Sequence, residues 1–232
     1  MGALPGSLAM QNTSSATPSA AVLALLSPNI EPTEARRCVD VLALDPAQPA
    51  WVVASSAREP VWSACSAELA TPFGLGRATI KQGSDDGLPR AAGVGSAVAI
   101  ERLAQSWQEA LIAVRLTSPE YPRVRFADVG ILGELVPFAE RMAGHHDLEA
   151  LQALSTDLQD LLETLVAQPS VRATAAALEL HHSTVQDRLE QVNTLLGYDV
   201  RVPGGRFRLA VTVLALRVTQ FRFAGAAGPR SL

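Results

Sequence analysis

Cysteine is scarce in this sequence, and the two cysteines that are present stand alone. The chain of 232 residues contains Cys38 and Cys65, and neither has a second cysteine or a histidine at the spacing of a metal site. Isolated cysteines are typical of small core residues in a reducing cytoplasm, so we expect free thiols and no disulfide. The adjacent histidines at 145–146 and 181–182 would point to opposite sides of a helix, which predicts polar or capping roles and no metal site.

An excess of basic residues is absent as well. The chain has 19 lysines and arginines against 23 aspartates and glutamates, which gives a formal net charge of −4 and a pI of about 5.6. This balance is not typical of nucleic-acid-binding proteins, so any basic surface has to be local. Residues 160–223 are close to neutral, and their arginines could form such a surface: Arg172, Arg188, Arg201, Arg206, Arg208, Arg217 and Arg222.

No stretch approaches the roughly 18 apolar residues that a membrane-spanning helix needs. The apolar run from Ala20 to Leu26 is short, and no lysine or arginine precedes it, so we interpret it as part of an amphipathic segment and not as a secretory signal. Residues 1–19 are rich in Ser, Ala, Thr, Gly and Pro and predict a flexible N-terminus. Residues 224–232 predict a flexible tail. We expect a cytoplasmic protein with no membrane segment.

Motifs for catalysis are also missing. The segments Gly74-Leu75-Gly76 and Gly93-Val94-Gly95 lack the third glycine of a dinucleotide-binding loop, so we interpret both as tight turns. No Gly-x-Ser-x-Gly elbow of a hydrolase occurs. We therefore expect no enzyme, no catalytic residue and no bound cofactor or metal.

What the sequence does contain is a helix-turn-helix pattern between Ser170 and Gly197. Pro169 ends the preceding helix, and Ser170 can cap a first helix that runs from Val171 to about Leu178. The second helix is expected to begin at Ser183, where Ser183-Thr184-Val185-Gln186 has the form of a capping box. Residues 179–182 are then the turn, and Gly197 closes the second helix.

The second helix carries one apolar stripe, made of Val185, Leu189, Val192 and Leu196. Its other side is polar, as a helix that reads the DNA major groove requires. A generic helical hairpin would give the same pattern, so periodicity alone leaves both interpretations open.

A resemblance favours the first interpretation, because residues 145–222 are similar to the C-terminal domain of the PucR/CdaR family of bacterial transcription regulators. The similarity continues through an arginine-rich connection into a closing apolar helix, Leu209 to Val218. The residues that carry it are Leu161-Leu162-Glu163-Thr164-Leu165, Ala173-Thr174-Ala175, Ala177-Leu178, His181, Thr184-Val185, Arg188-Leu189, Leu195 and Gly197.

The resemblance implies that the second helix enters the major groove of double-stranded DNA. The residues expected to face base edges are Ser183, Thr184, Gln186, Asp187 and Gln191. The residues expected to hold phosphates are Arg172, Arg188, Arg201, Arg206 and Arg208.

The chain also departs from the family pattern in this helix. Family members usually carry basic or aromatic residues here, whereas this chain has His182, Gln186, Asp187 and Glu190, and Glu179 replaces a usual turn glycine. Asp187 and Glu190 would both point away from the core, toward a polyanion. Because cations supply most nonspecific DNA affinity, a second hypothesis stays open: a protein-interaction or antagonist module without strong DNA binding.

Between residues 20 and 137, helical and strand patterns mix in an α+β order. We expect helices at 32–42, 60–70 and 100–116, and strands at 50–55, 77–82, 93–99 and 123–126. The turn at 83–87 would form an antiparallel hairpin in the middle of this region.

This half of the chain resembles the GGDEF-like domain that precedes the helix-turn-helix in the same family. The similarity rests on Glu34-Ala35-Arg36-Arg37 followed by residues 49–53, on Gly93-Val94-Gly95 before Leu103 and Ala110, and on residues 124–132. A nucleotide cyclase would need carboxylates for magnesium and a turn shaped for a triphosphate. The chain offers only Asp85-Asp86-Gly87, an ordinary turn sequence, so we expect a regulatory or dimerisation domain.

Leucines recur every three or four residues from Leu148 to Leu165, along a linking helix that starts at Asp147. Packing on the helix-turn-helix would cover this stripe, but a second copy of the chain could also do so. A homodimer would suit a motif that reads two half-sites. Residues 198–208 could form a small β wing or a simple loop.

The sequence thus predicts an α+β protein in four parts: a flexible N-terminus (1–19), a GGDEF-like domain (20–137), a PucR-type helix-turn-helix domain (145–223) and a tail (224–232). The larger sensory region that usually precedes these domains in the family is not in this sequence, so how the protein is switched stays open, and a small-molecule effector is a possible partner whose identity the sequence does not give. The expected function is transcription regulation by a dimer that binds double-stranded DNA.

Overall fold

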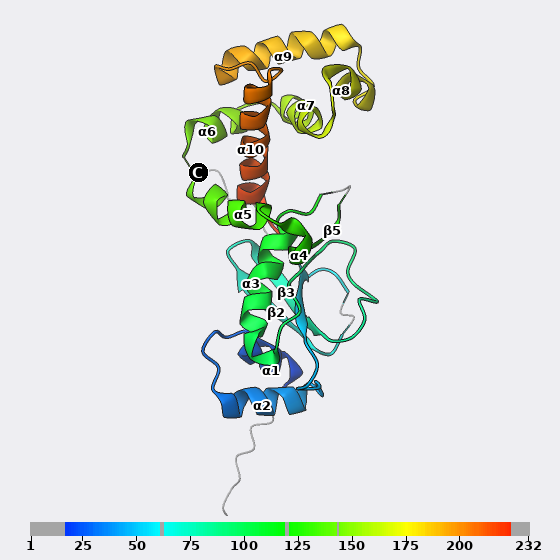
Figure 1. Cartoon of the computed structure of the whole chain (residues 1–232), viewed down its shortest axis with the longest axis vertical. Coiled ribbons are helices and arrows are strands. Elements are labelled where there is room, and N and C mark those ends of the chain that lie inside the picture. Colours follow the sequence, from blue (N-terminus) through cyan, green and yellow to red (C-terminus); the bar gives the residue numbers. More distant parts are fainter. Residues whose placement is uncertain (1–16, 61–62, 119–120, 143, 224–232) are drawn as a thin grey trace, which may run out of the picture.

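The computed structural model describes residues 17–60, 63–118, 121–142 and 144–223. These residues form an elongated molecule, with a β-sheet toward one end and a group of helices at the other (Figure 1). The fold class is α+β, as predicted. In chain order the elements are α1 (Pro18–Leu25), α2 (Pro32–Val41), β1 (Trp51–Ser56), β2 (Ser66–Thr71), β3 (Gly74–Lys81), β4 (Ala92–Val94), η1 (Ile100–Arg102), α3 (Leu103–Val114), β5 (Arg123–Arg125), α4 (Phe126–Val129), α5 (Leu132–Arg141), α6 (His146–Gln152), α7 (Thr156–Ala167), α8 (Val171–Ala177), α9 (His182–Leu196) and α10 (Pro203–Gln220).

The first helix begins inside the segment that was predicted to be flexible. The hydroxyl of Thr17 accepts a hydrogen bond from the amide of Ala20 at 3.3 Å, and Pro18 takes the first helical position. A capping hydroxyl followed by proline is a strong helix start, and this explains why α1 begins before residue 20. The rest of the predicted N-terminus (1–16) and the predicted tail (224–232) lie outside the described residues.

The sheet has five strands in the order β2-β3-β1-β4-β5. Strand β1 is antiparallel to both β3 and β4, β2 is antiparallel to β3, and β5 is parallel to β4. The predicted strands at 50–55, 77–82 and 123–126 correspond to β1, β3 and β5, and the predicted helices at 32–42 and 100–116 correspond to α2 and to η1 with α3. The region is therefore α+β, as expected.

The predicted helix at 60–70 and the predicted hairpin at 83–87 were wrong. Residues 66–71 form strand β2, in which Glu68 lies opposite Arg77 of β3 and their side chains form a 2.8 Å ion pair. Such cross-strand pairs stabilise a strand whatever the local helix propensity. The hairpin is therefore β2–β3, and the turn at 83–87 leads to β4, which pairs with β1 and ends at Val94.

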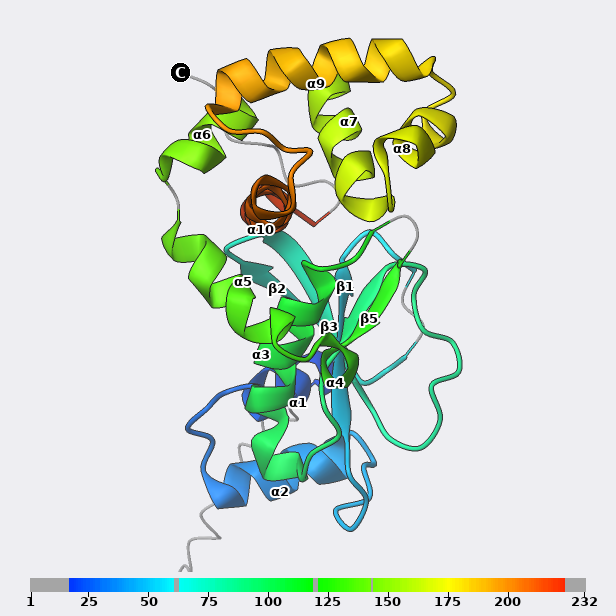
Figure 2. The same cartoon turned by 45° about the horizontal axis from the view of Figure 1, so that its top comes forward.

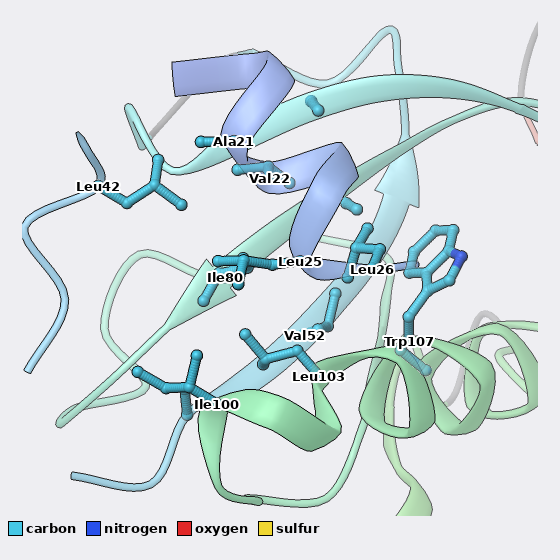
Figure 3. Packing of buried hydrophobic residues seen from close by; sticks show 14 of the residues in the cluster. Ala21, Val22, Leu25, Leu26, Leu42, Val52, Ile80, Ile100, Leu103 and Trp107 are labelled. Carbon is cyan, nitrogen blue, oxygen red and sulfur yellow. The ribbon is translucent and has the colours of Figure 1, made fainter. Parts of the chain in front are cut away.

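A hydrophobic cluster between one face of the sheet and α1, α2 and α3 forms what we call the sheet core. Leu25 of α1, Val52 and Ile80 of the sheet, and Leu103 and Trp107 of α3 all meet there (Figure 3). Cys38 is buried in this core and Cys65 packs against it, and both are free thiols, as predicted. Burial raises the pKa of both thiols.

Helix α3 lies unusually close to the sheet because two glycines face it. A side chain on Gly93 of β4 would overlap the backbone of Ala110 and Val114, and one on Gly95 would overlap the backbone of Ser106. The interpretation of Gly93-Val94-Gly95 as a tight turn was therefore wrong, since these glycines permit close helix–sheet packing. Gly74, with φ of 104°, does take a turn conformation.

A second cluster, which we call the helical core, is formed by α5 to α10. The leucine stripe lies inside it: Leu148, Leu151, Leu161, Leu162 and Leu165 are each no more than 2% exposed. The single linking helix that was predicted is wrong, because the stripe belongs to two helices, α6 and α7. The side-chain amide of Gln159 donates to the carbonyls of Leu151 and Leu154 and so caps the end of α6. Of the two ways to cover the stripe, packing within the chain is the one observed.

Helix α10 connects the two cores, passing between the helix-turn-helix and the sheet (Figures 1 and 2). It packs on α5, α6 and α7, and the segment after it reaches the sheet core through Phe221 and Phe223. The amide of Phe223 donates to the carbonyl of Phe73 at 2.9 Å. Val136 of α5 belongs to the helical core, so this core begins before the domain boundary predicted at residue 137.

Two further properties concern the described part of the chain as a whole. None of its helices has the length and apolar character of a membrane span. It also contains no cluster of three or more His, Cys, Asp or Glu side chains that could hold a metal ion.

Candidate nucleic-acid interface

The predicted helix-turn-helix consists of α8 and α9, with α7 packed against both. Helix α8 begins as expected, because the hydroxyl of Ser170 accepts a hydrogen bond from the amide of Ala173 at 3.1 Å. Thr174 and Ala175 are buried where α8 meets α9. Small side chains at this crossing let the two helices approach each other.

The turn between α8 and α9 requires a left-handed residue, and the chain has Glu179 there with φ of 54°. The amide of Glu179 donates to the carbonyl of Ala176 at 3.2 Å, and the amide of Leu180 donates to that of Ala175 at 2.9 Å. These two bonds are the Schellman motif that ends many helices, and its left-handed position favours glycine. Glu179, which replaces the usual turn glycine, therefore has a strained backbone conformation.

Replacing Glu179 with glycine is expected to stabilise the protein by about 0.5–1 kcal/mol. Relief of the strain at the left-handed residue outweighs the opposing effect of glycine, which gives the unfolded chain more freedom. Urea unfolding monitored by circular dichroism would measure this. Gly197→Ala is the matched control, since Gly197 takes φ of 75° at the end of α9 with no neighbour within 4 Å. That variant should be destabilised by a similar amount. A destabilised Glu179→Gly protein would contradict the assignment.

The cap of helix α9 lies two residues before Ser183, where the capping box predicted it. The cap is His181, whose Nδ1 accepts from the amide of Ser183 at 3.3 Å and lies 2.7 Å from the Ser183 hydroxyl. Ser183 is therefore inside the helix and is not its cap. An imidazole nitrogen can replace a hydroxyl as acceptor, and this is why the hydroxyl-based capping rule misplaced the start.

One side of α9 is buried in the helical core and the other side is exposed. The predicted stripe is confirmed: Val185, Leu189 and Val192 are 0% exposed and Leu196 is 3% exposed. The helix lies across the end of the molecule, with the rest of the helical core on its inner side (Figures 1 and 2). In the described part of the chain, the outer side of the helix is thus the exposed one.

Of the residues predicted to face base edges, Ser183, Gln186, Asp187 and Gln191 are exposed and Thr184 is half-buried. Two residues that the prediction left out of this set share the exposed surface: Glu190 and Thr194. The Thr194 hydroxyl donates to the carbonyl of Glu190 at 3.0 Å and so points back along the helix. The sequence pattern already placed Glu190 outward, so the sequence contained the signal for this residue.

Two of the five predicted phosphate-binding arginines have guanidinium groups with no partner among the described residues. Arg172 in the first turn of α8 is exposed, and Arg188 in α9 is half-buried. Within the described residues, neither guanidinium has a hydrogen bond or an ion pair. Both can therefore accept an anion without losing an internal contact.

Arg201 is held by carboxylates on the same surface. It donates to both oxygens of Asp199, at 2.9 and 3.1 Å, and its Nη1 lies 3.6 Å from Glu190. The hydrogen bonds from Arg201 lower the pKa of Asp199 to about 2. Asn193 also bonds Asp199, at 3.0 Å. Arg201 thus neutralises part of the acidic charge on α9 and is only partly available to a phosphate.

Arg206 and Arg208 serve internal contacts, which argues against their predicted role. Arg206 donates to the carbonyls of Leu165 and Gln168 and caps the end of α7. Arg208 binds the buried carboxylate of Asp147 at 2.5 and 2.6 Å, and its Cζ lies 4.2 Å from the centre of the Tyr198 ring. The sequence places Asp147 far from Arg208, so no local pattern could reveal this pair.

Residues 198–202 form a turn and contain no strand. Asn193 accepts from the amide of Val200 at 2.9 Å, and Val200 is fully buried in the helical core. Pro203 then starts α10, and Gly205 lies so close to the carbonyl of Asp199 that a side chain would overlap it. The β wing that the sequence left open is not formed, and the loop alternative is correct only for residues 198–202, because residues 203–208 belong to α10.

The ion pair between Arg208 and Asp147 predicts a loss of stability in acid. The hydrogen bonds from Arg208 lower the pKa of Asp147 below its usual value near 3.8. A lowered folded-state pKa contributes stability that is present above the unfolded pKa and is lost as pH falls through the folded one. Arg208→Ala leaves a buried carboxylate unpaired and should cost about 2 kcal/mol at pH 7, a value reduced because Arg208 is half exposed.

Urea unfolding at pH 7 and pH 4 would check this expectation. The difference in stability between the native protein and the variant should be smaller at pH 4, because protonation of the unpaired Asp147 relieves the cost of its buried charge while the native ion pair is being lost. Arg201→Ala is the matched control, because its partner Asp199 is open to solvent, and it should change stability far less. Equal losses of unfolding free energy in Arg208→Ala and Arg201→Ala would show that burial of Asp147 does not make its ion pair more stabilising than the exposed one.

Comparison with known proteins gives one family match. Residues 158–215 match the PucR C-terminal helix-turn-helix domain, and these residues extend from α7 into α10. A search of the curated proteins gives no match. The GGDEF-like resemblance of residues 20–137 lies outside the matched segment and stays a prediction.

Among solved structures, the chain is similar to the crystal structure of a regulator of polyketide synthase expression from Bifidobacterium adolescentis. The two share 14% sequence identity with a TM-score of 0.33, over 88% of this chain and 98% of that one. At this TM-score the likeness supports no conclusion about fold or function.

Proposed function

We propose that this chain, whose residues 158–215 match the PucR C-terminal helix-turn-helix domain, is a transcription regulator that places α9 in the major groove of double-stranded DNA. The observation that carries the proposal is the orientation of α9, which lies at one end of the molecule (Figure 1). Its polar side is exposed there, and its apolar stripe is buried. A helix mounted in this way can enter a groove without any part of the helical core having to move. Such a role also implies a cytoplasmic protein.

The exposed side chains of α9 suit direct reading of bases. The amides of Gln186 and Gln191 each offer a donor and an acceptor, the pair that recognises adenine in the major groove. Asp187 can accept from the amino group of cytosine. Ser183 and Thr184 would bond either a base or the backbone. This set favours sequence-specific contacts over a purely electrostatic one.

Arg172 and Arg188 are the proposed phosphate-binding residues, because their guanidinium groups have no internal partner among the described residues. Arg201 is a weaker candidate, since Asp199 and Glu190 hold it. With two or three cations facing phosphates, we expect a complex that depends on salt less steeply than those of proteins with many phosphate contacts.

We also propose that the chain binds DNA as a homodimer, because a helix-turn-helix of this kind reads two half-sites about one helical turn apart. The leucine stripe is buried and therefore cannot form the contact between two copies of the chain. The exposed apolar surface near β5 is the interface that we propose instead. Tyr121 and Ile131 are 73% and 76% exposed there, beside Leu132 at 43%. Light scattering after size exclusion would give the mass in solution.

A salt titration tests DNA binding directly. Fluorescence anisotropy of a labelled duplex from the region upstream of the chain's own operon would be measured at rising salt concentration, against a shuffled duplex of equal length. Tighter binding to the upstream duplex, with affinity falling as salt rises, is the expected result. Equal and weak binding to both duplexes even at low salt would contradict the proposal.

Arg188→Ala is expected to weaken DNA binding about tenfold in the same assay, because one charge-assisted phosphate contact is lost. Arg37→Ala is the matched control, since Arg37 is an exposed arginine on α2, at the opposite end of the molecule from α9 (Figure 1). Unchanged affinity in Arg188→Ala, or an equal loss in Arg37→Ala, would show that the arginine on α9 is not a phosphate contact.

One observation favours the second candidate function, a protein-interaction module. Asp187 is an exposed carboxylate with no ion pair in the described residues, and Glu190 is 69% exposed with only a 3.6 Å contact to Arg201. An acidic outer surface suits a basic partner protein. Co-purification of a partner that stays bound to Arg188→Ala, together with the absence of DNA binding, would favour this alternative.

A further inference from the structure

A cavity of about 430 Å³ opens where the sheet meets α5. Its walls come from three elements: the β2–β3 turn with Phe73, α3 with Trp107 and Leu111, and α5 with Pro137 and Glu140. This volume lies within the range of roughly 300–1,000 Å³ of small-molecule sites, which often occur between structural units. The lining is mainly apolar, with one strong cation.

That cation is Arg115, which directly follows α3 and is only 4% exposed. Its Nη1 lies 2.7 Å from a carboxylate oxygen of Glu140, and its Nη2 donates to the carbonyl of Val218 at 3.4 Å. The ring centre of Phe73 lies 4.3 Å from its Cζ. The buried Nε–H has no hydrogen-bond partner in the described residues. A guanidinium offers five N–H donors and keeps its charge, so this one is short of acceptors.

The groups around Arg115 balance its buried positive charge only in part. Glu140, its ion-pair partner, has a side chain that is 48% exposed and can therefore move into solvent. Burial lowers the pKa of Arg115, Glu140 opposes this, and Arg222 adds a second positive charge. A buried cation needs a well-placed anion to offset its desolvation. A carboxylate that enters the cavity could provide two oxygens where Glu140 now provides one close contact.

We propose that this cavity binds a small carboxylic acid with an apolar body, whose carboxylate pairs with Arg115 in place of Glu140. The planar guanidinium suits two parallel hydrogen bonds to such a group. The apolar body would lie against Trp107, Leu111 and Leu69, which line the cavity. This site depends on contacts within the free protein and not on DNA binding.

Replacing Glu140 by the bound acid would also break the Arg115–Glu140 ion pair, which links the sheet core to the helical core. Glu140 belongs to α5, and Val136 and Ala139 of the same helix lie in the helical core. Arg115 therefore joins the sheet to α5 through Glu140 and to α10 through Val218. If the proposed DNA-binding function holds, an acid at Arg115 would change how the helix-turn-helix is mounted and so affect DNA affinity.

Octanoate is the probe for this site, and octanol is its uncharged counterpart. Isothermal titration of the full chain should give saturable binding of octanoate that is at least about tenfold tighter than that of octanol. Arg115→Met should abolish the preference for the acid. Glu140→Gln removes the competing carboxylate while keeping its size, so it should bind octanoate several-fold more tightly than the native protein.

Circular dichroism would show whether each variant is folded. If Arg115→Met fails to fold, Glu140→Gln still decides the question, because its half-exposed side chain can be replaced without disturbing the core. Equal affinity for octanoate and octanol would overturn the proposal. So would a lack of saturable octanoate binding to Glu140→Gln at millimolar concentration, or weaker binding to it than to the native chain.

Discussion

Gly93→Ala is expected to destabilise the protein by about 3 kcal/mol or more, a large part of the total stability of a typical domain. The added methyl group would overlap the backbone of Ala110 and Val114 in α3. Backbone atoms of a helix cannot turn aside as a flexible side chain can, so α3 would have to move away from β4. That shift would loosen Trp107 and the other α3 residues of the sheet core.

Gly204→Ala is the matched control for this variant. Gly204 lies in the first turn of α10 and has no neighbour within 4 Å of an added Cβ. Alanine should be neutral there or stabilise the helix by up to about 1 kcal/mol. Urea unfolding of both variants would separate the two effects. A cost below about 1 kcal/mol for Gly93→Ala would mean that α3 does not lie as close to the sheet as described.

Leu189→Ala is expected to cost about 3 kcal/mol, because Leu189 is 0% exposed in the middle of the α9 stripe. The variant loses the burial of the removed atoms and leaves a cavity between α9 and the rest of the helical core. Thermal or urea unfolding would measure the loss. DNA binding would fall as well at temperatures where the variant unfolds.

Leu195→Ala makes the same chemical change on the same helix, but at a residue that is 53% exposed. It should cost less than about 1 kcal/mol, because little apolar surface leaves water when this side chain folds. Similar losses in the two variants would contradict the assignment of the buried and exposed sides of α9. The comparison therefore tests the orientation of the helix with stability measurements alone.

Periodic features were predictable from the sequence. The stripe from Val185 to Leu196 repeats every three or four residues, and it fixed both the existence of α9 and the side that is buried. Ser170 was found because a hydroxyl before a helical pattern is a local signal. The same logic placed α2 and α3, whose apolar residues have the period of a helix.

Features that depend on partners distant in the chain were not predictable. Strand β2 has its ion pair with Arg77 on β3, and Gly93 and Gly95 make sense only once α3 lies over them. Arg206 and Arg208 looked like surface arginines because their acceptors on α7 and Asp147 are remote in sequence. Arg201 is different, since Asp199 two residues earlier was a local signal that it would be occupied.

Capping by histidine was a local feature that the rules did not cover. His181 accepts from the amide of Ser183, so the helix cap lies two residues before the position that the capping box indicated. This difference matters for the site, because it places Ser183 within the first turn of α9. The residues expected to face bases nevertheless stay on the exposed side of that helix.

The most direct test of the central claim is dimethyl sulfate protection of the upstream duplex, because this reagent methylates guanine N7 in the major groove. The account predicts that the native chain protects guanines in two patches about one helical turn apart. Gln191→Ala should change the protection within those patches and leave the fold intact. A bound complex in which every major-groove guanine stays reactive would contradict the insertion of α9 into the groove.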